Sequence, residues 1–290
     1  MSNFIIYTDS ACDIPVEKLN EWGVKYIELS YMFEGEDVQH LNYDLPAGDF
    51  YNEMRAGKVA KTSAANVASF KDFFEEGLKQ GNNILYIGFS SGLSTTLNSA
   101  NIAADELKEK YPDRKIITVD TLAASLGMGL LLYFATKKKA EGATLEETAE
   151  YIESIKLNLC HWFTVDDLVY LKRGGRISPS VAFVGGLLGI KPVLHMDNEG
   201  HLINMFKVRG RKASIQAIAD KYGELAINKG DPDDTLFICH GDCIDDANEL
   251  ASIVKKKYGV NVMLIGYTGP VIGAHSGPGT LALFFLGKER

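Results

Sequence analysis

The chain has 290 residues, about twice the length of a usual single domain, so two domains are expected. Hydrophobic residues make up 46% and charged residues 23%, which argues against long disorder and fibrous repeats. The net charge of -8 argues against broad nucleic-acid binding, because that binding needs a concentrated basic face. Apolar stretches are too short or too interrupted by glycine to span a membrane. Four scattered cysteines and the absence of a secretory leader favour a cytoplasmic protein.

The first half of the sequence repeats a strand, a polar loop and a helix. Phe4 to Tyr7 is an apolar run followed by Thr8-Asp9-Ser10, and Asp13 is expected to cap a helix that begins at Pro15. The same pattern recurs twice: Asn83 to Phe89 before a helix ending at Lys110, and Lys115 to Val119 before a helix ending at Ala140. Repeated β-α units predict a parallel sheet that binds ligands beyond the carboxyl ends of its strands.

The pattern changes near residue 163. Two apolar runs flank Asp197-Asn198-Glu199-Gly200, which predicts a hairpin from Lys191 to Val208. The segments after it predict an α+β unit: a helix from Arg211 to Asn228, a strand at Leu236 to Cys239, a helix from Ala247 to Lys257 and a strand at Val260 to Tyr267. We therefore expect a two-domain α/β fold. An N-terminal parallel-sheet α/β domain would cover residues 1–163, completed by 268–290, and a smaller C-terminal α+β domain would cover 164–267. The final apolar run, Leu281 to Leu286, fits a strand of either sheet.

One motif favours an enzyme. Gly88-Phe89-Ser90-Ser91-Gly92 matches the G-x-S-x-G turn of serine hydrolases, lies between a predicted strand and helix, and precedes His275 in the chain. The alternative interpretation is that these small polar residues cap the following helix. No upstream His-Gly-Gly-Gly loop supplies an oxyanion hole, so a serine acyl-hydrolase using Ser90 or Ser94 with His275 is the second hypothesis.

Two further groups of residues suggest ligands. Cys239-His240-Gly241-Asp242-Cys243 offers metal-binding atoms, but its spacing has no second ligand pair, so no metal is expected. The basic segments Lys172 to Arg176 and Lys207 to Lys212 are suited to a phosphate or an acidic partner, although a solvated face is the more common role of such segments. Neither contains a complete phosphate-binding loop.

A single histidine lies among small residues near the end of the chain, in Gly273-Ala274-His275-Ser276-Gly277-Pro278-Gly279-Thr280. A lone histidine is usually structural. The flanking glycines allow a ligand to approach the backbone closely, so a binding role is also considered.

Together, these segments resemble the DegV family over nearly the whole chain. The resemblance rests on a series of motifs in the family's order: Thr8-Asp9-Ser10 with Asp13, Thr62-Ser63, Ser91-Gly92-Leu93-Ser94 with Asn98-Ser99-Ala100, Leu171 with Gly175-Arg176-Ile177, Lys191-Pro192, Gly200, Arg209, and His275 to Thr280.

The resemblance implies a carrier without catalytic activity of its own. It would bind a long-chain fatty acid such as hexadecanoate in a buried tunnel and present the carboxylate to a fatty acid kinase, which forms an acyl phosphate for phospholipid synthesis. It implies that Thr62, Ser94 and His275 bind the carboxylate, with Ser63 and Thr95 as second choices. Arg176 and Arg209 are assigned to the kinase-facing surface. No cofactor is implied, and contact with a membrane would be transient.

An acyl tail supplies enough binding energy for such a carrier. Burial stabilises by about 0.8 kcal/mol per methylene, so around fifteen methylenes give on the order of 10 kcal/mol before ordering costs. The apolar segments Val181 to Leu194 and Leu130 to Phe134 fit either a tunnel lining or ordinary core packing. The sequence leaves open which of Ser90, Ser91 and Ser94 faces the ligand.

Overall fold

A computed structural model describes residues 4–177, 189–231 and 234–290. A four-stranded parallel sheet has the strand order β2-β1-β6-β7. Its strands are β1 (Phe4–Asp9), β2 (Lys25–Ile27), β6 (Asn83–Gly88) and β7 (Ile116–Asp120). The predicted β-α units and parallel sheet are confirmed, because the three predicted apolar runs form β1, β6 and β7, which are neighbours in this sheet.

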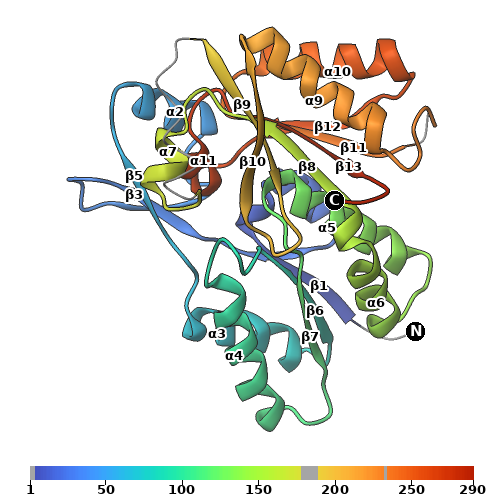
Figure 1. Cartoon of the computed structure of the whole chain (residues 1–290). Coiled ribbons are helices and arrows are strands. Elements are labelled where there is room, and N and C mark those ends of the chain that lie inside the picture. Colours follow the sequence, from blue (N-terminus) through green and yellow to red (C-terminus); the bar gives the residue numbers. More distant parts are fainter. Residues whose placement is uncertain (1–3, 178–188, 232–233) are drawn as a thin grey trace.

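Helices cover both faces of the parallel sheet (Figure 1). Successive β1 side chains point to opposite faces, so Ile6 packs into one apolar cluster and Tyr7 into another. The helices around this sheet are α1 (Val16–Glu21), α3 (Val67–Lys79), α4 (Thr96–Lys110), α5 (Ser125–Ala140) and α6 (Leu145–Ile155). The prediction that Asp13 caps α1 was wrong: Pro15 occupies the cap position without a side-chain hydrogen bond, and Asp13 follows the short 3-10 helix η1 (Ser10–Cys12).

A second sheet has six strands in the order β10-β9-β8-β13-β11-β12. These are β8 (Leu159–Thr164), β9 (Ile190–Met196), β10 (Leu202–Arg209), β11 (Leu236–His240), β12 (Val262–Tyr267) and β13 (Leu281–Leu286). The predicted β9–β10 hairpin is confirmed. The final run joins this sheet, because β13 pairs with β8 and β11. The division into domains at residue 163 stays a prediction.

Helix α5 lies between the two sheets and contacts strands of both (Figure 1). Leu130, Leu131 and Leu132 are fully buried in it, which explains its continuous apolar sequence. The opposite face of the six-stranded sheet is covered by α9 (Arg211–Leu225) and α10 (Ile244–Tyr258), which carry their own apolar cluster. Within the described ranges, no helix is both long and apolar enough to cross a membrane.

A small antiparallel sheet, β4-β3-β5, was not predicted. It consists of β3 (Ser30–Phe33), β4 (Gln39–Leu41) and β5 (Ala60–Ser63), and α2 (Ala47–Arg55) follows β4. Helix α11 (Pro270–Ser276) contacts α2, β3, β5 and the short helix α7 (Val169–Arg173). The other 3-10 helix, η2 (Lys156–Asn158), precedes β8. This arrangement brings β5 and α11, which are far apart in the sequence, side by side.

Candidate functional site

A cavity of about 490 Å³ lies where β5, the β6–α4 loop, α7 and α11 meet the six-stranded sheet. Hydroxyl-bearing, partly exposed residues line its mouth: Thr62, Ser63, Ser91, Ser94 and Thr95. Apolar residues form much of the wall, among them Leu29, Phe89, Leu171, Met196, Leu202, Val271 and Phe284. The volume falls within the range of about 300–1,000 Å³ that is common for small-molecule sites.

Thr62 and His275 meet at this mouth. Thr62 Oγ1 lies 2.8 Å from His275 Nε2, although 213 residues separate them in the sequence. Thr62 belongs to β5, and His275 occupies the last turn of α11, which begins with Pro270 at its first position and ends at Gly277. Burial, and then the positive charge of Arg176, lower the pKa of His275 to about 4. The imidazole is therefore neutral near pH 7.

His275 is closely packed against α7. A Cβ atom on Gly174 would lie 2.1 Å from His275 Nδ1, so only a glycine leaves room for the ring in this position. Nδ1 is buried and has no hydrogen-bond partner among the described residues. The ring therefore contacts Thr62 through Nε2, and the backbone at Gly174 confines its other side.

The other predicted carboxylate ligands also lie at the mouth. Ser94 is half-buried, and its hydroxyl lies 2.9 Å from the hydroxyl of Thr96. Ser63 and Thr95 are exposed and line the same cavity. The structure therefore brings together all five residues that were expected to bind a carboxylate.

The two arginines lie in different surroundings. Arg176 lines the cavity, donates from Nε to the Leu93 carbonyl at 3.1 Å, and donates from Nη1 to the Gly174 carbonyl. Burial lowers its pKa. Arg209 is exposed at the end of β10 and is not part of the cavity wall.

Ser90 faces away from the cavity. It is fully buried, and its hydroxyl donates to the carbonyl of Gly200 at 2.9 Å, which ties the β6–α4 loop to the β9–β10 turn. Ser91 and Ser94 line the cavity instead. In the described part of the chain, neither Ser90 nor Ser94 has a hydrogen bond to His275.

Further polar residues line the inner wall of the cavity and were not predicted from the sequence to meet the ligand. Ser125, His161, Cys239 and Thr268 are each at most 5% exposed. The Ser125 hydroxyl donates to the carboxyl group of Asp13, and the Thr268 hydroxyl donates to the Cys239 sulfur at 3.1 Å. Because they come from separate elements, no local pattern in the sequence could have identified them as one group.

The Cys239 to Cys243 segment has structural roles. The Cys243 amide donates to His240 Nδ1 at 3.3 Å, and the Cys243 thiol donates to the Thr280 carbonyl. Burial raises the pKa of both thiols, to about 12 for Cys239 and about 11 for Cys243.

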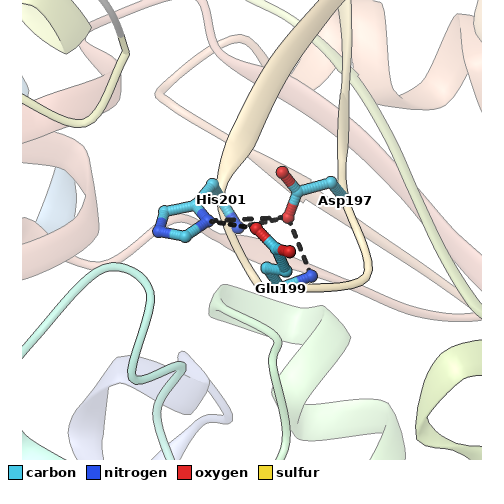
Figure 2. A group of neighbouring side chains, drawn as sticks. All are labelled: Asp197, Glu199 and His201. Atoms are coloured by element: carbon cyan, nitrogen blue, oxygen red, sulfur yellow. Dashed lines mark hydrogen bonds and ion pairs between the residues drawn. The ribbon is translucent and has the colours of Figure 1, made fainter.

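A different group of possible metal ligands lies at the β9–β10 turn, where Figure 2 shows Asp197, Glu199 and His201 side by side. Asp197 Oδ1 accepts hydrogen bonds from the backbone amides of Glu199 and His201, at 3.0 and 2.9 Å. This carboxylate therefore stabilises the turn itself, and we assign the three residues a structural role.

The two apolar segments considered for the tunnel have different outcomes. Leu130 to Phe134 pack in the core and do not line the cavity. Of Val181 to Leu194, residues 181–188 lie outside the described residues, while Pro192, Val193 and Leu194 are buried in β9.

Comparison with known proteins agrees with this architecture. A family model described as an uncharacterised protein of the DegV family matches residues 3–288. The chain belongs to the DegV family. A DegV domain-containing protein of Clostridium perfringens is 45% identical over 100% of this chain and 99% of its own length.

Two solved DegV structures are also similar. One, described as a lipid-binding protein from Thermotoga maritima, is 30% identical with a TM-score of 0.84 and covers 100% of both chains. The other, from Thermus thermophilus, is described by its fatty acid binding. It is 29% identical with a TM-score of 0.88 and covers 98% of this chain and 99% of its own.

Proposed function

We propose that this DegV protein binds one long-chain fatty acid, with the carboxylate at the cavity mouth and the acyl tail inside. The observation that carries the proposal is the Thr62–His275 pair, which lies 2.8 Å apart at the polar mouth of a cavity with a largely apolar wall. The Thermus thermophilus relative, described by its fatty acid binding, supports it.

The chemistry of the pair suits a carboxylate. A neutral imidazole carries one ring proton, and a threonine hydroxyl has one proton to donate. With the ring proton on Nε2, His275 donates to Thr62 Oγ1, and the Thr62 proton is free to point toward the ligand. Ser94, Ser63 and Thr95 supply further hydroxyl donors, so a carboxylate at the mouth is hydrogen-bonded rather than buried at a cost of several kcal/mol.

The tail supplies most of the affinity. Each methylene removed from water contributes about 0.8 kcal/mol, whereas each net hydrogen bond to a charged group contributes about 1.5–3 kcal/mol. The hydroxyl groups therefore fix the orientation of the fatty acid, and the apolar wall holds it.

We further propose that this protein acts in the cytoplasm as a non-catalytic partner of a fatty acid kinase, with Arg176 and Arg209 assigned to kinase contact. Arg176 is the better supported of the two, because it lies at the mouth, where a phosphoryl group would meet the carboxylate. A guanidinium there would stabilise the charge of the transferred group.

The first test is native mass spectrometry of the purified protein, followed by solvent extraction of the bound molecule and a titration with stearate. One equivalent of fatty acid, retained or taken up, is the expected result. Thr62→Val should weaken stearate binding about 10- to 100-fold because a hydrogen bond to a charged group is lost. Ser154→Ala, on the exposed surface of α6, is the control. A protein that neither carries nor takes up fatty acid would refute the proposal.

The kinase role has a separate readout. Purified fatty acid kinase with ATP should form acyl phosphate from the loaded protein, and Arg176→Gln should reduce the rate more than it reduces stearate affinity. Equal loss of both would place Arg176 in lipid binding only. Hydrolysis of an acyl ester by the protein alone would favour the serine hydrolase instead.

A further inference from the structure

The inner wall of the cavity is more polar than an alkyl tail requires. Ser125, His161, Cys239 and Thr268 all line it, and each is at least nine-tenths buried. Hydrogen bonds within the protein use part of their polar capacity, and the methylenes of a tail would use none of the rest. These groups therefore indicate that the part of the ligand beside them is polar.

Three of them lie close together next to a buried carboxyl group. The Thr268 hydroxyl donates to the Cys239 sulfur, and the Ser125 hydroxyl donates to Asp13. Ser125 is also near enough to Cys239 to influence the pKa of its thiol. The protons of both hydroxyl groups are therefore used within the protein.

Thr268 can act as a hydrogen-bond acceptor for the ligand. The hydroxyl proton of Thr268 is used by Cys239, so the oxygen of Thr268 presents only lone pairs to a further partner. His161 is an acceptor too. Its Nδ1 lies 3.2 Å from the Leu159 carbonyl, which can only accept, so the ring proton is on Nδ1 and the buried, unpartnered Nε2 carries the lone pair.

Thr268 lies away from the proposed carboxylate site. Thr268 precedes α11, which begins at Pro270, whereas His275 is in its last turn. At about 1.5 Å of rise per residue, Pro270 and His275 are roughly 8 Å apart along the helix, and Thr268 lies beyond Pro270.

We propose that this cavity selects a fatty acid with a hydroxyl group in the middle of its chain, which donates a hydrogen bond to Thr268 Oγ1. The inference rests on the proposed fatty-acid binding and names the ligand more narrowly. A hydroxyl next to the carboxylate would not reach this acceptor. A ketone at the same mid-chain position would not donate to it. A ligand hydroxyl that donates to Thr268 would add a hydrogen bond to the one that Thr268 donates to Cys239, and each of the two bonds would polarise the other.

The test compares three probes by isothermal titration at pH 8: stearate, stearate with a mid-chain hydroxyl, and stearate with a β-hydroxyl. Burial raises the pKa of Asp13 to about 7, so at pH 8 its carboxyl group is mostly ionised and accepts from Ser125. The mid-chain hydroxystearate should bind about 3- to 10-fold more tightly than stearate, which corresponds to one net hydrogen bond. The β-hydroxystearate should show no such gain.

Variants locate the effect. Thr268→Val should abolish the preference, measured as the ratio of the two affinities within the same variant, which a purely structural role for the hydroxyl does not predict. Thr280→Val is the matched control, because Thr280 lines the same cavity but donates to the Gly277 carbonyl at 2.8 Å. If Thr268→Val does not fold, Cys239→Ala removes the sulfur that accepts from Thr268 and should reduce the preference.

The outcomes separate the two proposals. Stearate binding without a gain for the mid-chain hydroxystearate would overturn this inference and leave the carrier function intact. A preference that persists in Thr268→Val, or in Cys239→Ala where only that variant folds, would overturn the assignment of the preference to Thr268 and Cys239. Binding of none of the three probes would overturn the carrier function and this inference together.

Discussion

Gly174 provides a sensitive test of the proposed carboxylate site, because its substitution would move His275 although Gly174 is not part of the cavity wall. The residue ends α7 with φ -73° and ψ -9°, a conformation that alanine adopts without strain. Its new Cβ would lie 2.1 Å from His275 Nδ1, 3.0 Å from Cε1 and 3.1 Å from Cγ. Gly174→Ala therefore forces the ring to move by about 1 Å, since real Cβ contacts below 3.0 Å essentially do not occur.

The magnitude follows from the hydrogen bond that this shift breaks. A movement of about 1 Å takes the 2.8 Å contact between Thr62 Oγ1 and His275 Nε2 out of hydrogen-bonding range. Losing one partner of a buried hydrogen bond costs about 1–3 kcal/mol, so stearate should bind roughly 5- to 150-fold more weakly to Gly174→Ala. Isothermal titration measures this change, and a thermal melt checks that the variant folds.

The neighbouring glycine is the control. Gly175 has φ 69° and no atom within 4 Å of its would-be Cβ, so Gly175→Ala strains the backbone by roughly 1–2 kcal/mol without reaching His275. It should lower the melting temperature and leave stearate affinity within about twofold. Unchanged stearate affinity in folded Gly174→Ala would refute the reasoning, because it would mean that α7 moves instead or that His275 does not bind the ligand.

Three further predictions concern stability. Burial raises the pKa of Asp13 to about 7, above its ordinary value near 3.8, so the folded state loses stability as the pH rises from about 4 to about 7. Asp13→Asn should remove this loss, on the order of 4 kcal/mol, from the urea unfolding free energy; equal pH slopes would contradict it. Ser90→Ala should cost about 1–3 kcal/mol in urea unfolding but keep stearate affinity, and loss of binding would contradict its role as a tie to Gly200. Arg290 donates to the carbonyls of Leu122, Lys156, Leu159 and Asp197, so Arg290→Met should cost about 2 kcal/mol or more, and an unchanged melting temperature would be the contrary result.

The elements that sequence patterns predicted are those whose local periodicity matches their final environment. β1, β6 and β7 are apolar runs followed by polar turns, and a parallel sheet covered by helices on both faces buries most of β1 and β6 and part of β7. The β9–β10 hairpin was equally visible, because Asp197 to Gly200 supplies the turn residues.

The elements that were missed have weak local signals. β4 and β5, with sequences Gln-His-Leu and Ala-Lys-Thr-Ser, have too few apolar residues to stand out as strands. Helix α11 was not predicted, because the sequence around His275 is rich in glycine. Pro270 at its first position and Gly277 just after its end are nevertheless typical helix boundaries and could have revealed it.

The residues of the candidate site also differ in whether the sequence could predict them. Thr62, Ser94 and His275 were named through the DegV motifs, and the fold gathers them at one mouth. The inner wall was out of reach, since Ser125, Cys239 and Thr268 become neighbours only when α5, β11 and the segment before α11 pack together. The roles of Ser90 and Ser91 depend on which way a turn rotates, and that is set by the contact with Gly200.

The same geometry favours the proposed carrier over a hydrolase. A serine nucleophile needs a base within hydrogen-bond reach, and the base needs a third group to orient it. Here His275 Nε2 pairs with Thr62 rather than a serine, and Nδ1 faces Gly174, where a hydrolase has a carboxylate. With a pKa near 4, the imidazole is also a weak proton acceptor. A histidine held in this way can donate a hydrogen bond to a hydroxyl that meets an anion, and this is why we propose a carboxylate as the ligand.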